Sequence, residues 1–185
     1  MPSVKEIVST ILNVSISSIK RVVVLKGYHD DGKTSTLTDL IRQLHEQFPA
    51  AWIGPRKFNP ERFDVSRLSE GVVIKDSTAV FKIDGVTVLI RTGGDNPSTI
   101  VHTFSIAKRY NAQIIVTALK VGEKREERSQ TAYRYISEHF SFDETIIDIC
   151  RKGFRNVDYR SEQEQAAELV KIVKTSISSV RNQKI

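Results

Sequence analysis

Short runs of β-branched residues alternate along the chain with longer segments in which apolar residues recur every three or four positions. The short runs are typical of strands buried on both faces, and the recurring positions are typical of amphipathic helices. Strands that alternate with helices favour an α/β fold, here a three-layer sandwich with a mainly parallel sheet. We predict strands over residues 21–25, 79–83, 86–90, 112–118 and 145–150, and helices over residues 3–13, 33–48, 97–110, 123–139 and from 161 onward.

Local signals mark several of these boundaries. Asp84-Gly85 between two apolar runs predicts a two-residue turn and therefore one antiparallel hairpin. Asn96-Pro97 supplies an N-cap and a first-turn proline, and Ser161-x-x-Glu164 forms a capping box. Residues 55–70 combine prolines with basic residues and read as irregular. No repeat or linker divides the chain, so we expect one domain over residues 1–185.

Composition places the chain among ordinary soluble proteins, because 39% of its 185 residues are hydrophobic and 27% are charged. No apolar stretch approaches the ~18 residues of a membrane-spanning helix, and the first residues lack a signal-peptide pattern. The single cysteine, Cys150, lies in an apolar run and cannot form an internal disulfide. These features predict a cytoplasmic protein with a buried thiol.

The net charge of +6 and the pI near 9.5 predict a partner that carries negative charge. A phosphorylated small molecule, a nucleic acid and an acidic protein surface all fit this description, and a membrane is not expected. Basic residues are spread along the chain, so the charge does not select among these partners.

One segment carries a specific chemical signature. Residues 27–34, Gly27-Tyr28-His29-Asp30-Asp31-Gly32-Lys33-Thr34, match the phosphate-binding pattern G-x-x-x-x-G-K-[ST] at every fixed position. The two glycines allow a tight turn whose N–H groups surround phosphate oxygens, and the following helix adds its positive end. In this pattern Lys33 lies between the β- and γ-phosphates, and the Thr34 hydroxyl binds Mg²⁺. Ser35 is placed to add a hydrogen bond to phosphate.

Residues 21–48 resemble the first strand, loop and helix of the P-loop NTPase superfamily. The resemblance implies the fold of that superfamily, ATP or GTP as the ligand, and Mg²⁺ as the cofactor. It covers well under a third of the chain and identifies no substrate. Asp30 and Asp31 depart from the usual pattern, since carboxylates beside phosphates repel them. We expect both side chains to face solvent rather than to reach a cation.

P-loop enzymes use a carboxylate near the end of a neighbouring strand to hold the water shell of the magnesium ion. Asp95 is the candidate, because it follows the predicted strand 86–90, and the alternative is an aspartate that only shapes a loop or caps a helix. The hairpin and Thr92-Gly93-Gly94-Asp95 resemble the second-switch region of small GTPases, although Arg91 stands where that family has an aspartate. The guanine-reading Asn-Lys-x-Asp is absent, which favours ATP. Residues 93–96 are also similar to small P-loop proteins of bacteria and phages.

Two basic segments are candidates for catalysis or acceptor binding. Lys120, Lys124, Arg125 and Arg128 resemble the arginine-bearing lid of small-molecule kinases, where cations stabilise the transferred phosphoryl group. The alternative, which we favour, is a solvated helix start in which neighbouring glutamates pair with these bases. The basic segment 56–67 occupies the position of the acceptor-binding segment of nucleoside-monophosphate kinases, and it reads equally well as a loop or as an effector-binding surface.

The leading hypothesis is a small ATP-dependent phosphotransferase that moves the γ-phosphate to a phosphorylated or nucleotide acceptor. One alternative is a P-loop ATPase or GTPase that acts as a switch or motor component on nucleic acid or a protein partner. A second alternative is a nucleotide-binding regulatory domain with little turnover. The candidate catalytic residues are Lys33, Asp95, Arg125 and Arg128; the nucleotide-binding residues are Gly27, Tyr28, His29, Asp30, Asp31, Gly32, Lys33, Thr34 and Ser35; the Mg²⁺ ligands are Thr34 and Asp95.

Overall fold

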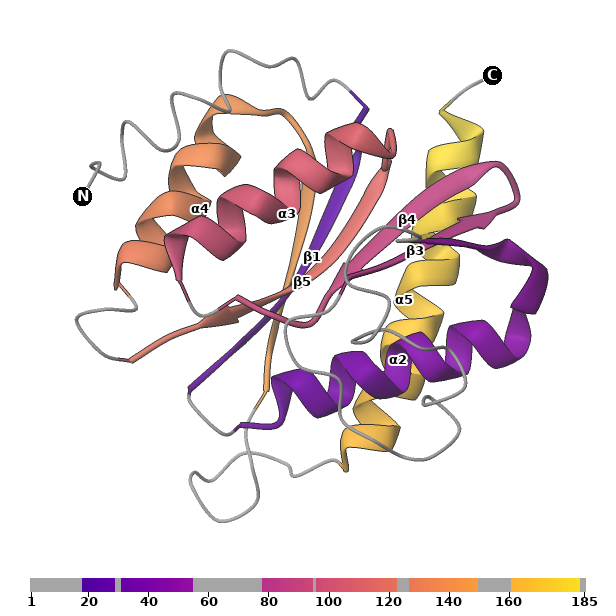
Figure 1. The fold of residues 1–185 in the computed structure, drawn as a ribbon, viewed down its shortest axis with the longest axis horizontal. Coiled ribbons are helices and arrows are strands. Elements are labelled where there is room, and N and C mark those ends of the chain that lie inside the picture. The colour runs from indigo at the N-terminus through magenta and orange to yellow at the C-terminus, as the bar shows by residue number, and fades with distance from the viewer. Residues whose placement is uncertain are drawn as a thin grey trace.

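The computed structural model describes residues 18–28, 31–54, 78–94, 96–122, 127–149 and 161–183, and it confirms the alternation of strands and helices (Figure 1). The sequence predicts every strand and α-helix of this set except β2. In chain order the elements are β1 (Arg21–Gly27), α2 (Lys33–Gln47), the 3-10 turn η1 (Pro49–Ala51), β2 (Trp52–Gly54), β3 (Thr78–Ile83), β4 (Val86–Arg91), α3 (Pro97–Arg109), β5 (Ile114–Lys120), α4 (Glu127–His139), β6 (Asp143–Asp148) and α5 (Glu162–Asn182).

The strands form one sheet in the order β2-β3-β4-β5-β1-β6. β1 lies between β5 and β6 and is parallel to both, and β4 is parallel to β5. β3 runs antiparallel to β4, which confirms the predicted hairpin, and it also pairs antiparallel with β2. The turn residues Asp84 and Gly85 have φ values of 50° and 79°, the left-handed backbone that such a two-residue turn requires.

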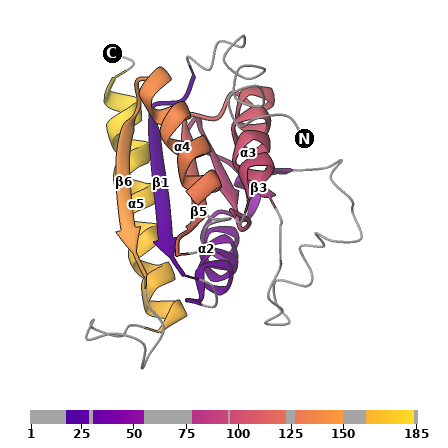
Figure 2. The same cartoon turned by 90° about the vertical axis from the view of Figure 1, so that its left-hand side faces the viewer.

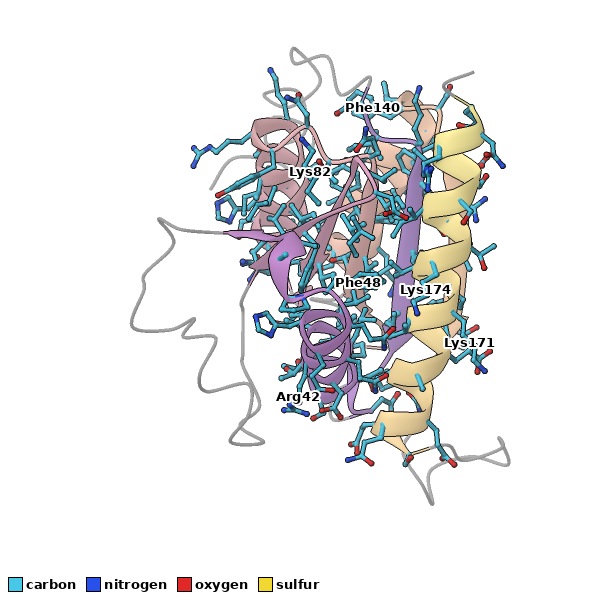
Figure 3. The ribbon with its side chains drawn as sticks, turned by 90° about the vertical axis from the view of Figure 1, so that its right-hand side faces the viewer. Arg42, Phe48, Lys82, Phe140, Lys171 and Lys174 are labelled. Carbon is cyan, nitrogen blue, oxygen red and sulfur yellow. The ribbon has the colours of Figure 1, made fainter. Side chains whose placement is uncertain are left out.

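Helices cover both faces of this sheet, as the three-layer prediction requires (Figures 1 and 2). α2 and α5 pack on one face with Val23 of β1, and α3 and α4 pack on the other face with Val24. At the far end of α2, the Nζ of Lys174 on α5 lies 5.4 Å from the ring centroid of Phe48 (Figure 3). The core is therefore divided by the sheet into two apolar clusters.

Two helix starts follow their predicted capping chemistry. At α3, the Oδ1 of Asn96 accepts a 2.8 Å hydrogen bond from Thr99 N. At α5, Ser161 Oγ accepts from Glu164 N at 3.2 Å, and the Glu164 carboxylate accepts from Ser161 N at 2.8 Å. Both predictions are confirmed, because these side chains satisfy N–H groups that lack an intrahelical partner.

Several predictions fall outside the described residues. They concern the helix over residues 3–13, the irregular segment 55–70 and Cys150. The last strand, β6, lies two residues before its predicted position of 145–150. Within the part of the chain that the structure describes, no helix has the length and apolar character needed to span a membrane.

The chain connections single out the carboxyl ends of β1 and β5. These strands are neighbours, yet β1 leads into α2 on one face and β5 leads toward α4 on the other. In open α/β sheets, ligands bind at this kind of topological switch point, outside the carboxyl ends of the strands. Gly27 and Lys120 are paired there, and Val121 N donates a 3.1 Å hydrogen bond to Gly27 O.

Candidate functional site

The glycine loop joins β1 to α2 at this switch point, in the strand–loop–helix context that its motif requires. Gly32 has a φ of 84°, a left-handed value that favours glycine, and it is the N-cap residue of α2. It has no side chain with which to cap the helix, and Thr36 N donates a 2.9 Å hydrogen bond to Gly32 O. The positive end of α2 therefore faces the loop. His29 and Asp30 lie outside the described residues.

The Lys33 side chain folds back over the loop and is only 7% exposed. Its Nζ donates a 2.9 Å hydrogen bond to Gly27 O and a second hydrogen bond to Tyr28 O. A buried ammonium needs such acceptors, because removing a charge from water is costly. These hydrogen bonds hold the ammonium in place at the loop.

The expectation that Asp31 faces solvent is wrong. Its side chain is 7% exposed, and its Oδ2 accepts a 2.6 Å hydrogen bond from Tyr28 N. Carboxylates form short, strong hydrogen bonds with backbone N–H groups, and here such a group belongs to the loop itself. The bond compensates for the lost hydration of the carboxylate. Asp31 therefore stabilises the loop and also places a negative charge inside it.

The segment that follows β4 reaches the start of α2. Thr34 Oγ1 donates to Thr92 O at 3.5 Å. Gly94 lies so close to β5 that a Cβ at this position would be 1.9 Å from Ala118 O. Only a glycine permits residues 92–94 to lie this close to β5. In this position the Thr92 carbonyl lies beside Thr34. Residue type does not predict this role for Thr92, since the carbonyl belongs to the backbone.

A buried arginine, Arg91, lies at the end of β4. Arg91 is 8% exposed, and its Nη1 donates a 2.7 Å hydrogen bond to Thr78 Oγ1. Burial, followed by the positive charges of Arg91 and Arg109, lowers the pKa of His102 below its ordinary value of 6.5. At neutral pH the imidazole is therefore uncharged.

The first turn of α5 packs beside the first turn of α2. A Cβ on Gly32 would lie 3.1 Å from the Oε1 of Glu162, and Thr36 Oγ1 donates to Gln165 Oε1 at 3.4 Å. Sequence patterns did not predict Glu162 and Gln165 at this position. The capping box predicts where α5 begins, but a sequence contains no local signal for the neighbour against which that helix packs.

The structure brings together most of the residues of the predicted phosphate site. Gly27, Tyr28 and residues 31–35 form one compact loop and helix start. The predicted lid is not tested, because Lys124 and Arg125 lie outside the described residues and only the backbone of Arg128, in the first turn of α4, is described. The predicted Mg²⁺ carboxylate, Asp95, also lies outside the described residues. Their catalytic and metal-binding roles stay predictions.

Among the described residues, no cluster of three or more histidine, cysteine or acidic side chains is positioned to hold a metal ion. The chain significantly matches no family model, no curated protein and no solved structure. The chemistry of the glycine loop itself is therefore the basis for assigning a function.

Proposed function

We propose that the chain binds Mg²⁺-ATP through residues 27–35 and acts as a small phosphotransferase that moves the γ-phosphate to an acceptor. The observation that carries the proposal is the buried ammonium of Lys33, held inside a glycine loop at the N-terminus of α2. The N-terminus of α2 and the Lys33 ammonium lie together at this point, and each of them favours a phosphate group.

Lys33 has a clear role in this site. Its bonds to Gly27 O and Tyr28 O keep the ammonium in the loop, where phosphate oxygens would replace the carbonyl oxygens as acceptors. The exchange is favourable because a phosphate oxygen carries negative charge and attracts the ammonium more strongly than a neutral carbonyl oxygen does. The same cation would stabilise the charge that spreads over the transferred phosphoryl group.

The residues present also fit Mg²⁺. This ion prefers oxygen ligands and keeps several waters, and it usually takes one or two protein ligands together with phosphate oxygens of the substrate. The Thr34 hydroxyl, half-buried at the start of α2, supplies such a ligand. A magnesium ion bound in this way needs no preformed cluster of acids, and it would stabilise the negative charge of the phosphate groups.

The proposal is tested first by binding and then by turnover. We expect calorimetry with the full chain to detect saturable heat with Mg²⁺-ATP and a weaker signal when EDTA removes the metal ion. A comparison with Mg²⁺-GTP checks the preference for adenine. An absence of heat with both nucleotides would overturn the proposal.

The acceptor is sought by measuring ADP release over nucleosides, nucleoside monophosphates, DNA and RNA. A phosphotransferase releases ADP at a rate that rises with acceptor concentration and forms a phosphorylated product. ADP release that DNA or RNA stimulates without such a product would instead identify an ATPase that acts on nucleic acid. The net charge of +6 makes nucleic acid a necessary part of the screen.

Asp31→Asn is expected to strengthen the binding of Mg²⁺-ATP. The asparagine side chain keeps an oxygen that accepts the hydrogen bond from Tyr28 N, while the negative charge inside the loop is removed. Removing one charge that repels the phosphates should lower the Kd by about tenfold, or about 1.4 kcal/mol. Calorimetry at constant ionic strength measures the change. Glu46→Gln, on an exposed position near the opposite end of α2, is the control and should leave the Kd unchanged. Weaker binding by Asp31→Asn would show that the carboxylate helps the loop to bind.

A further inference from the structure

A cavity lies on the face of the sheet opposite to α2. It has a volume of about 440 Å³, within the range of roughly 300–1,000 Å³ that is usual for small-molecule sites. It is bounded by β1, β5, β6 and the side of α4, and Figure 2 shows α4 beside β1 with β6 at the neighbouring edge. None of the described lining residues belongs to the glycine loop or to α2.

The floor of this cavity is apolar. It is formed by Val24 of β1, Leu119 of β5 and Ile146 of β6, and Ile146 contributes most of the exposed apolar surface because Val24 and Leu119 are buried. Ile146 is 50% exposed, which makes it the one exposed large apolar residue among the strand side chains that the structure describes. Contact with an apolar ring or chain would remove this surface from water, which is favourable by about 25 cal/mol for each Å² buried.

The rim of the cavity is positively charged. Lys26 borders it from β1 and Arg134 borders it from α4, and none of the described lining residues is acidic. Arg134 Nε lies 3.9 Å from Glu138 Oε1, but both side chains are more than half exposed, so this ion pair is weak. Gln130 and Thr131 of α4 add hydrogen-bonding groups. The lining therefore combines apolar surface with two cations.

The nearest acids on β6 do not neutralise both cations. Tyr133 donates a hydrogen bond to the Glu144 carboxylate, and burial together with this bond raises the pKa of Tyr133, so the phenol stays a donor. Asp148 is paired with Lys26 in the register of β1 and β6, but it does not line the cavity. Among the described residues, Arg134 and Lys26 are thus the charged groups that line the cavity.

We propose that this cavity binds a small amphipathic anion. An apolar ring or chain lies on Val24, Leu119 and Ile146, and a single oxyanion, such as a carboxylate, sulfonate or phosphate ester, lies between Lys26 and Arg134. The site is separate from the glycine loop, and its occupation requires no nucleotide. The proposal therefore stands or fails independently of the proposed phosphotransferase activity.

The test uses naphthalene-2-carboxylate as the probe, titrated into the full chain without nucleotide and followed by backbone ¹H–¹⁵N NMR. We expect saturable shifts at Leu119, Gln130 and Ile146. The uncharged naphthalene-2-carboxamide should bind about tenfold more weakly, because two partly exposed ion pairs contribute about threefold each. Shifts that are confined to the glycine loop, or equal binding of the amide, would overturn the proposal.

Variants assign the affinity to individual side chains. Lys26→Met and Arg134→Met should each weaken binding of the carboxylate by about threefold and leave binding of the amide unchanged. Ile146→Glu should abolish binding of both probes. Lys171→Met removes an exposed lysine of α5 (Figure 3) and is the matched control, which should bind like the wild type. Each variant is first checked for an unchanged thermal midpoint. Equal carboxylate affinity of the wild type, Lys26→Met and Arg134→Met would refute the assigned anion site.

Discussion

Replacing Gly94 by alanine is expected to lower the free energy of unfolding by about 3 kcal/mol, at the upper end of the usual cost of overpacking. The new Cβ would lie 1.9 Å from Ala118 O and 2.5 Å from Ala118 C. These are backbone atoms of a buried central strand, so they cannot turn away as the end of a flexible side chain would. For a chain of this length, the midpoint of thermal unfolding should fall by about 6–12 °C. Circular dichroism and urea titration measure both quantities.

Gly85→Ala is the matched control for Gly94→Ala. Gly85 has a φ of 79°, and a Cβ built there meets no atom within 4 Å. Alanine at this turn therefore adds backbone strain of about 1 kcal/mol but no steric contact. The φ of Gly94, in contrast, is not in the positive region, so its requirement for glycine is steric. A smaller loss of stability for Gly94→Ala than for Gly85→Ala would contradict the close packing against β5.

The same contact connects stability with the site. Gly94 holds residues 92–94 over β5, and Thr92 O accepts the hydrogen bond from Thr34 Oγ1. If a side chain at position 94 lifts this segment, the Thr34 hydroxyl loses its neighbour. Nucleotide binding by Gly94→Ala should therefore be measured only at temperatures where the variant is folded, because an unfolded fraction would lower the apparent affinity.

Local sequence signals predicted those features whose cause lies within a few residues. The Asp84-Gly85 turn needs a positive φ at both positions, and the start of α3 needs a side-chain acceptor, which Asn96 supplies. The glycine loop belongs to this class, since its glycines, lysine and following helix form one continuous segment. In each of these features, the residues that interact are close together in the sequence.

Features that depend on distant contacts were not predictable in the same way. β2 has three residues and is defined by its pairing with β3, so it has no period of its own. The packing of Glu162 against Gly32 joins two helix starts that are far apart in the sequence. The burial of the Asp31 side chain was not predicted, because it depends on how the loop turns Tyr28 N toward the carboxylate. Residue type and spacing do not determine such geometry.

Lys33→Met is expected to weaken the binding of Mg²⁺-ATP by about 100-fold or more, because charge-assisted hydrogen bonds contribute about 1.5–3 kcal/mol each and two are lost. Methionine has nearly the length of lysine, but it has no ammonium to donate to phosphate oxygens. The change should raise the Kd measured by calorimetry and also lower kcat, since the same cation stabilises the charge of the transferred group. A loss of kcat beyond the loss of affinity would identify a contact that strengthens in the transition state.

Loss of stability must be separated from loss of the phosphate contact in this variant. Without the ammonium, the loop loses two hydrogen bonds to Gly27 O and Tyr28 O, although Gly27 O still accepts from Val121 N. We expect this to cost about 1–2 kcal/mol of folding free energy, too little to unfold the domain. Lys82→Met, on an exposed position of β3 close to the hairpin turn (Figure 3), removes the same charge and should bind nucleotide like the wild type. If Lys33→Met folds and binds Mg²⁺-ATP with wild-type affinity, the buried lysine has only a structural role, and the glycine loop is not a triphosphate site.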